Sequence, residues 1–322
     1  MKKLIVHVGP HKTGTTYLQN ILEHSEEILR EQGYEYPRLF YMAKGQHHLV
    51  TYLLQGKLQE FREECRKINE SDRNIIVSSE NFIHLNRSHF EKFKEIFHGK
   101  RVEVVFFFRN PTQRFVSYWK ETVKHGGTDS FFKYFSTEMM RPFFSRQINT
   151  LNFLNDLEKV FGKESLKIVD FDSAKKEGTI LDLFEDVVGA KLNRDVKKVI
   201  NKSLDIEEIE LIRYLNTKAK KNGQLKGSNI REKYFRKINR SDFPLDELKK
   251  IMGRYRMELG FGNLFIDKKI IESLSNKYKE NVVNSIMDSS NSKSSLLSDE
   301  WVFDEKISDL VRELEGKIIQ GV

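Results

Sequence analysis

The stretch HVGPHKTGTT, residues His7–Thr16, joins an apolar run to a helical pattern. Its two glycines, which have four residues between them and are followed by two threonines, are typical of a loop that binds phosphate between a strand and a helix. The common form of this loop, G-x-x-x-x-G-K-[ST], carries a lysine directly after the second glycine. Here Thr15 occupies that position, and Lys12 lies three residues earlier. The sequence therefore predicts a phosphate-binding loop whose lysine has moved.

The composition is that of a globular protein. The chain has 322 residues, of which 39% are hydrophobic, so we expect one α/β domain with an appendage. No run of eighteen apolar residues occurs, which predicts that no transmembrane helix is present. The N-terminal stretch MKKLIVHVGP predicts a first strand rather than a signal peptide, because its apolar run is only five residues long and no small-residue cleavage site follows. The single cysteine, Cys65, excludes an internal disulfide and a zinc cluster, and it fits a reducing, cytoplasmic compartment.

The positive charge is concentrated in one segment. Lys218–Arg240 holds nine Lys or Arg residues and one acidic residue, which equals the net charge of +8 of the whole chain. Such a segment indicates an anionic partner, such as a phosphate, an acidic glycan, a nucleic acid or a membrane surface. A solvated basic face explains the charge equally well.

Short apolar runs alternate with helical patterns along the first two thirds of the chain. This order predicts an open, doubly wound α/β fold, a P-loop-type three-layer α/β/α arrangement with a central parallel sheet. Ligands of such sheets bind at the carboxyl ends of the strands. The expected strands are Leu4–Val8, Ile75–Ser79, Val102–Phe108 and Leu166–Phe171, and the expected helices include Tyr17–Gln32, Thr112–Lys124, Phe143–Phe161 and Thr179–Val188. A further helix is expected after Asp205, which forms a capping box with Glu208.

The chain changes character near residue 267. We therefore expect a main domain over residues 1–266 and a helical, serine-rich C-terminal extension over residues 267–322. The stretch NSIMDSSNSKSSLLSDE predicts a flexible linker. The final helix, Trp301–Ile319, has an apolar stripe that packs on the domain or forms a homodimer contact. The stripe consists of Ile307, Leu310, Val311, Leu314 and Ile318.

A second motif, VVFFFRNPTQRFVSYW, follows the third expected strand. Arg109 ends that strand, and Asn110 and Pro111 are suited to the N-cap and the first position of a helix. An arginine beside a helix N-terminus is a candidate anion site, although pairing with a surface carboxylate is an equally good explanation of Arg109 alone.

The two motifs together resemble those of the sulfotransferases that use 3′-phosphoadenosine 5′-phosphosulfate (PAPS). The segments HVGPHKTGTTYLQ, GYEYP and NKSL…EEIELIRYLN look most like bacterial members, many of which act on carbohydrates. The resemblance covers residues 4–265, and the tail beyond it has no counterpart. It implies sulfuryl transfer from PAPS, without a metal, to a hydroxyl of a carbohydrate, glycolipid or other glycoconjugate, and no nucleic-acid partner.

The resemblance also implies roles for individual residues. Arg109 and Ser117 match the pair that holds the 3′-phosphate of the donor, and Lys12 is expected to neutralise charge on the departing phosphate. The residues expected to bind the 5′-phosphosulfate are Pro10, His11, Lys12, Thr13, Gly14, Thr15 and Thr16.

Two residues compete for the role of the base that takes the acceptor proton. Glu80 follows the second strand, where the resemblance places a catalytic His or Glu, and we take it as the base. The alternative is that Glu80 is a carboxylate that caps a helix or lies in a loop and has no catalytic role. His48, in KGQHHLV, is expected to bind the acceptor and is the rival base.

Two other classes of function are compatible with parts of the sequence. A P-loop kinase or NTPase needs its lysine after the second glycine and an acidic strand end for Mg²⁺. Only Asp170 and Asp172 could serve a metal, and we expect Asp172 to be structural, as a cap or loop anchor. A nucleic-acid-binding protein would use Lys218–Arg240, but this segment lacks regularly interleaved aromatic residues.

Overall fold

A computed structural model of the chain describes residues 1–145, 148–196, 204–223, 229–238, 243–260, 265–287 and 293–320. The chain divides into two compact units, each built from three segments. The first unit contains Met1–Arg114, Pro142–Ile200 and Leu264–Asp288, and the second contains Phe115–Arg141, Asn201–Asn263 and Ser289–Val322. Neither unit corresponds to the expected segments 1–266 and 267–322, and that division remains a prediction.

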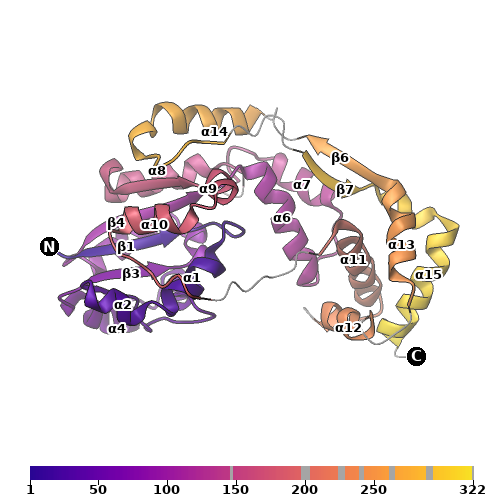
Figure 1. Cartoon of the computed structure of the whole chain (residues 1–322), viewed down its shortest axis with the longest axis horizontal. Coiled ribbons are helices and arrows are strands. Elements are labelled where there is room, and N and C mark those ends of the chain that lie inside the picture. The colour runs from indigo at the N-terminus through magenta and orange to yellow at the C-terminus, as the bar shows by residue number, and fades with distance from the viewer. Residues whose placement is uncertain are drawn as a thin grey trace. The chain divides into compact units, whose positions relative to one another are not determined.

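A parallel sheet of five strands forms the centre of the first unit (Figure 1). Its order is β2-β3-β1-β4-β5, so the central strand β1 pairs with β3 on one side and β4 on the other. The four expected strands are confirmed to within one residue at either end, whereas the two-residue strand β2 is too short to leave a periodic pattern. The strands are β1 (Lys3–Val8), β2 (Tyr34–Glu35), β3 (Asn74–Ser78), β4 (Arg101–Phe108) and β5 (Leu166–Asp170).

Helices cover both faces of this sheet, which confirms the three-layer prediction. On one face, Ile5 and Phe107 join a core with α1, α2, α9 and α10. On the other face, the ring of Phe106 lies 5.8 Å from that of Phe153 on α8, and Phe153 lies 5.7 Å from Phe90 on α5. The helices of this unit are α1 (Thr15–Glu23), α2 (Glu26–Glu31), α3 (His47–Gln55), α4 (Leu58–Glu70), α5 (Arg87–Ile96), α8 (Thr150–Phe161), α9 (Phe171–Glu177), α10 (Ile180–Val188) and α14 (Phe265–Asn276).

Two expected helices differ from the observed ones. The helix expected over Tyr17–Gln32 is broken into α1 and α2, because the side chains of His24 and Ser25 bond the carbonyls of Asn20 and Ile21 and so end α1. The helix expected to begin at Phe143 begins at Thr150. The side-chain amides of Asn149 and Asn152 both donate to the carbonyl of Phe143, which holds the preceding described residues in a turn.

The second unit surrounds α11. The N-cap of α11 is Asp205, whose side chain accepts from the backbone N–H of Glu208, as the sequence predicts. The other helices are α7 (Phe131–Met139), α12 (Asn229–Ile238), α13 (Leu245–Met252) and α15 (Glu305–Glu315), and α11 spans Ile206–Lys221. Helix α6 (Pro111–Lys124) begins in the first unit and continues into the second.

The serine-rich stretch is in part a strand, which corrects the prediction of a flexible linker. Lys293–Leu297 forms β7, which pairs antiparallel with β6 (Arg256–Gly260), and Leu296 and Leu297 are buried. The linker was predicted from amino-acid composition alone. Composition cannot show that the backbone of this segment forms its hydrogen bonds with another strand.

The apolar stripe of the tail packs within the second unit. Ile307, Val311, Leu314 and Ile318 are buried, and Leu310 is half-buried. Tyr214 on α11 donates from its hydroxyl to Glu315 at 3.2 Å, and Arg213 pairs with Asp299. Most of the stripe is thus covered by other described residues of the chain.

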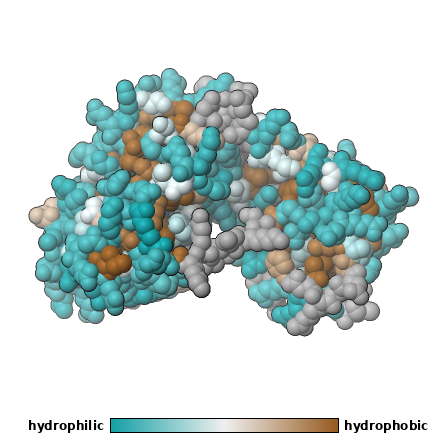
Figure 2. All heavy atoms as spheres, viewed as in Figure 1, coloured by the Kyte–Doolittle hydropathy of each residue, from teal (hydrophilic) through white to brown (hydrophobic). Residues whose placement is uncertain are grey.

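Hydrophilic side chains dominate the face drawn in Figure 2, and apolar residues appear there in small groups. In the part of the chain that the structure describes, no helix is both long and apolar enough to span a membrane.

Replacing Leu314 by Ala should lower the free energy of unfolding by about 2–5 kcal/mol, because its side chain is 1% exposed and the substitution leaves a cavity. Urea denaturation followed by circular dichroism measures this. Asp309→Ala, on the exposed side of the same helix, should stay within about 0.5 kcal/mol of the parent protein. Equal stability of the two variants would mean that α15 does not pack in the second unit.

Candidate active site

The loop between β1 and α1 is compact and internally bonded. The hydroxyl of Thr13 donates to the carbonyl of Pro10 at 2.7 Å, and that of Thr15 to the carbonyl of Gly9 at 3.5 Å. Only glycine fits at Gly9, because a Cβ there would lie 2.6 Å from Thr15 Oγ1 and 2.8 Å from Thr13 Oγ1. Gly14 has a φ of 74° and is the N-cap of α1. This geometry directs the loop and the positive end of the helix dipole toward the same space.

Lys12 is held by its backbone. Its φ is 73°, a left-handed conformation that is rare for a residue with a side chain. Its carbonyl accepts a hydrogen bond from Arg109 Nη1 at 3.0 Å. The Arg109 guanidinium in turn donates from Nε to the carboxylate of Asp172 at 3.1 Å and lies 5.8 Å from the ring centre of Phe171. Arg109, which follows β4, therefore connects the loop to the start of α9.

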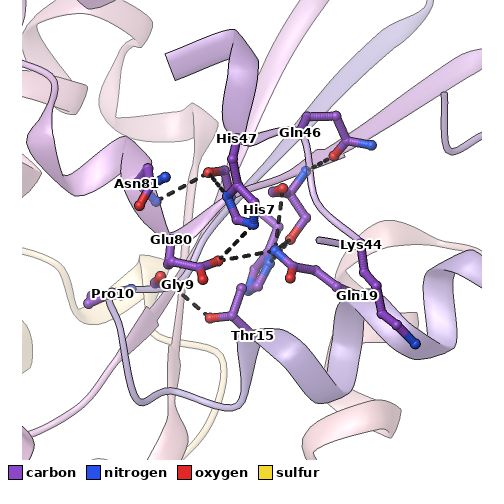
Figure 3. Close-up of polar contacts among 12 residues, drawn as sticks. His7, Gly9, Pro10, Thr15, Gln19, Lys44, Gln46, His47, Glu80 and Asn81 are labelled. Atoms are coloured by element: carbon purple, nitrogen blue, oxygen red, sulfur yellow. Dashed lines mark hydrogen bonds and ion pairs between the residues drawn. The ribbon is translucent and has the colours of Figure 1, made fainter. Parts of the chain in front are cut away.

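Glu80 follows β3 after one intervening residue, Ser79, and begins the short 3₁₀ helix Glu80–His84. Its side chain is 19% exposed. Gln19, on α1, donates from Nε2 to Glu80 Oε2 at 3.2 Å, and Nε2 of His47 lies 3.7 Å from the same oxygen (Figure 3). A carboxylate thus lies at the carboxyl edge of the sheet, held by groups from two helices.

The adjacent histidines of α3 have different surroundings. The side chain of His47 is buried and its Nδ1 lies 2.7 Å from Ser79 Oγ, whereas the side chain of His48 is exposed. Burial lowers the pKa of His47 below its ordinary value, an effect that the nearby Glu80 opposes. The structure therefore brings His47 close to Glu80, and the expected binding of the acceptor by His48 remains a prediction.

His11 connects the loop electrostatically with Glu80. Its ring is half-buried and lies 6.0 Å from that of His84. Burial lowers the pKa of His11 to about 4; the charge of Glu80 acts in the opposite direction, while Arg114 and Lys12 lower it further. The neutral ring is thus favoured beside a loop that already carries a lysine.

His7, at the end of β1, lies beneath this network. Its side chain is fully buried, its Nδ1 lies 2.8 Å from Ser78 Oγ, and its ring packs edge-on against Phe107 and Phe184. Its Nε2 has no hydrogen-bond partner among the described residues. Burial lowers the pKa of His7 from 6.5 to about 3, so the ring is neutral in neutral solution.

The expected site residues belong to both units. The loop, Glu80 and Arg109 lie at the carboxyl edge of one sheet, while Ser117 lies on α6 in the second unit. Pro10, Thr13 and Thr15 are buried, His11, Lys12 and Gly14 are half-buried, and Thr16 is exposed. In the described ranges, no group of three His, Cys, Asp or Glu residues is arranged to hold a metal ion.

Sequence reasoning did not identify Gln19 or His47 as neighbours of Glu80. Both had a signal. Gln19 lies between Leu18 and Leu22 on a helix whose apolar side faces the core, so its polarity there is unexpected. His47 precedes Val50 by three residues and shares its buried face.

The chain matches the model of the sulfotransferase domain over residues 2–237. Among solved structures it is similar to a sulfotransferase from Alicyclobacillus acidocaldarius, at 15% sequence identity and a TM-score of 0.43, over 67% of this chain and 93% of that chain. A search of curated protein sequences finds no match. The domain match includes the loop, Glu80, Arg109 and Ser117.

The burial of His7 predicts a dependence of stability on pH. Because the folded pKa is lowered, the unfolded state binds the proton first, so stability is lost as pH falls from about 6.5 toward about 3. One such proton corresponds to about 1.4 kcal/mol per pH unit. His7→Asn should remove this contribution, so its unfolding free energy, measured in urea between pH 6.5 and 4.5, should fall less steeply than that of the parent protein. Parallel slopes would contradict a buried, neutral His7.

Proposed function

This chain belongs to the sulfotransferase domain family, and from that premise we propose that it transfers the sulfuryl group of PAPS to a hydroxyl of a carbohydrate or glycoconjugate. The observation that carries the proposal is the pairing of a phosphate-type loop with a partly buried carboxylate, Glu80, at the same edge of the sheet. The loop suits an anionic donor, and the carboxylate suits an acceptor that must lose a proton.

The donor would bind with its 5′-phosphosulfate at the loop. Backbone N–H groups at the N-terminus of α1 and the charge of Lys12 would stabilise the phosphate oxygens. Arg109 and Ser117 are proposed to hold the 3′-phosphate. The hydrogen bond from Arg109 to the Lys12 carbonyl supports this proposal, because it keeps the proposed ligand of the 3′-phosphate next to the loop that would bind the 5′-phosphosulfate.

The reaction would be an in-line displacement at sulfur. The acceptor oxygen forms a bond to sulfur while the bond from sulfur to the 5′-phosphate oxygen breaks, and the acceptor proton passes to Glu80. Charge accumulates on the departing phosphate oxygen, where Lys12 would neutralise it. In such loose transfers, positioning and charge stabilisation supply most of the catalysis.

The enzyme alternative, a P-loop kinase or NTPase, is less well supported. It requires an acidic strand end for Mg²⁺. The side chain of Asp170 accepts from the backbone N–H of Ser173 and caps α9, and Asp172 pairs with Arg109, so both carboxylates have protein partners. Asp172 is thus the loop anchor and Asp170 the cap.

The basic segment is proposed to attract an acidic acceptor rather than a nucleic acid. Lys220, Lys221, Lys233, Arg236 and Lys237 are exposed on α11 and α12, and Lys226 lies outside the described residues. A cytoplasmic location and a homodimer remain predictions from the sequence. Screening acceptor glycans with radiolabelled PAPS tests the proposed reaction directly.

Replacing Arg109 by Ala should weaken binding of the product, 3′-phosphoadenosine 5′-phosphate, by about 2 kcal/mol more than binding of AMP, because a charged partner of the 3′-phosphate is lost. Titration calorimetry in EDTA measures both ligands. Asp172→Asn is the matched control, since it releases Arg109 but keeps its charge, and it should affect both ligands alike. An equal loss for both ligands in Arg109→Ala would make Arg109 only a support of the loop.

Replacing Glu80 by Gln should lower kcat by about 10²-fold or more, the usual contribution of a general base, while donor affinity stays within about twofold. His48→Gln should act on the acceptor KM instead. Kinetics with radiolabelled PAPS and calorimetry with its product separate these effects. A fully active Glu80→Gln beside an inactive His48→Gln that still binds the donor would make His48 the base.

A further inference from the structure

Two side-chain nitrogens, on different helices, lie near the same oxygen of Glu80. Gln19 Nε2, from α1, lies 3.2 Å from Oε2, and His47 Nε2, from α3, lies 3.7 Å from the same atom (Figure 3). Within the described part of the chain, Oε1 makes no hydrogen bond or ion pair. One carboxylate oxygen is therefore occupied by the protein, and the other remains for a ligand.

The amide of Gln19 has little freedom to turn away. Its side chain is 1% exposed, and Nε2 also lies 3.3 Å from Ser78 Oγ and 3.4 Å from the Ser78 carbonyl. Gly45 packs against both groups, since a Cβ at that position would lie 2.6 Å from Gln19 Nε2 and 2.8 Å from the Ser78 carbonyl oxygen. The N–H groups of Gln19 are thus directed at Ser78 and Glu80 by close packing.

The tautomer of His47 follows from the partners of Ser79. The Ser79 side chain is fully buried, and its Oγ accepts from the backbone N–H of Asn81 at 3.2 Å. The one acceptor that its hydroxyl proton reaches among the described residues is His47 Nδ1, at 2.7 Å. A proton on Nδ1 would leave that hydroxyl without an acceptor, which is costly for a buried group. The proton of neutral His47 therefore resides on Nε2, the atom that faces Glu80.

We propose that Gln19 and His47 are positioning residues that hold Oε2 of Glu80, so that Oε1 is presented to the acceptor hydroxyl. This inference rests on the proposed function, in which Glu80 takes the acceptor proton. Gln19 and Thr15 lie on the same helix, α1, so one rigid element aligns the donor loop with the base. Ser79 contributes by fixing the tautomer of His47.

The charged surroundings of Glu80 make the arrangement sensitive to pH. His47 approaches Glu80 from α3, and His11 approaches from the loop. Lys12, Arg114 and His84 are close enough to His11 to influence its charge, and His84 lies on the same 3₁₀ helix as Glu80. Donated N–H groups favour a charged carboxylate. Removing one of them should move the acid limb of the kcat profile to higher pH, an effect that a merely structural role would not produce.

The test compares six variants of the full chain, of which two are controls. Gln19→Met removes the N–H that donates to Oε2 and should lower kcat by about tenfold or more, the range for a hydrogen bond to a charged group. His47→Asn removes the N–H that lies 3.7 Å from the same oxygen, beyond hydrogen-bond distance, and should lower kcat by a smaller factor. His47→Gln keeps an amide near the position of Nε2 and should retain most of the activity. Glu80→Gln marks the loss of the base itself. Gln55→Met and His98→Asn repeat two of the substitutions at exposed positions and should match the parent protein.

The rate is measured as release of radiolabelled sulfate from PAPS to water, and as transfer to p-nitrophenyl β-D-galactoside, across pH 5–9. Affinity for 3′-phosphoadenosine 5′-phosphate, measured by calorimetry, should stay within about twofold in each variant and so reports an intact donor site. Long-range proton–nitrogen NMR should show the proton of His47 on Nε2.

The outcomes separate this inference from the function on which it rests. Parent-like kcat and pH profiles in Gln19→Met and His47→Asn, with an inactive Glu80→Gln, overturn the positioning role and leave Glu80 as the base. A fully active Glu80→Gln overturns the base assignment and this inference together. A proton on Nδ1 of His47 overturns the role of Ser79 and of the His47 contact. A lower kcat in Gln19→Met and in His47→Asn, with most of the activity retained in His47→Gln, supports the proposal.

Discussion

Parallel pairing of β1 with β3 and β4 is the constraint on which the site depends. His7 pairs with Ser78, and Val8 pairs with Phe106, so the three strands end at the same edge of the sheet. In a parallel sheet, the loops that follow the strands all begin at the same edge of the sheet. The phosphate-type loop, Glu80 and Arg109 are therefore neighbours although up to a hundred residues separate them in sequence. A shift of one residue in this register would turn the side chains at the strand ends to the opposite face.

The parts of this arrangement that depend on local sequence were predictable. Continuous apolar runs located the strands, and the glycine spacing located the loop and the start of α1. Glu80 and Arg109 could be placed because each immediately follows a strand. Gln19 and His47 could not be placed in this way, because their roles depend on how α1 and α3 pack against the end of β3. Helical periodicity indicated that His47 is buried, but it could not show that His47 lies opposite Glu80.

The tail illustrates a second limit of sequence reasoning. Serine-rich composition favours a linker when side chains alone are considered. In the structure, the backbone of Lys293–Leu297 pairs with β6, and the two leucines at its end are buried. The ladder partner lies in a segment more than thirty residues earlier, which composition cannot reveal. The same packing explains why the apolar stripe of α15, which could equally have served a dimer, is covered within its own unit.

The polarity at the end of β3 is an argument for function in itself. Ser78, Ser79, Gln19 and His47 are buried, and Gln46 accepts from the N–H of Ser78 through its own buried side chain. Apolar residues of similar size would pack there without the cost of desolvating so many donors and acceptors. The network holds one partly exposed group, the carboxylate of Glu80. A fold that needed only stability would have little use for this carboxylate, whereas a reaction that removes a proton beside a phosphate-type loop requires a base held in place.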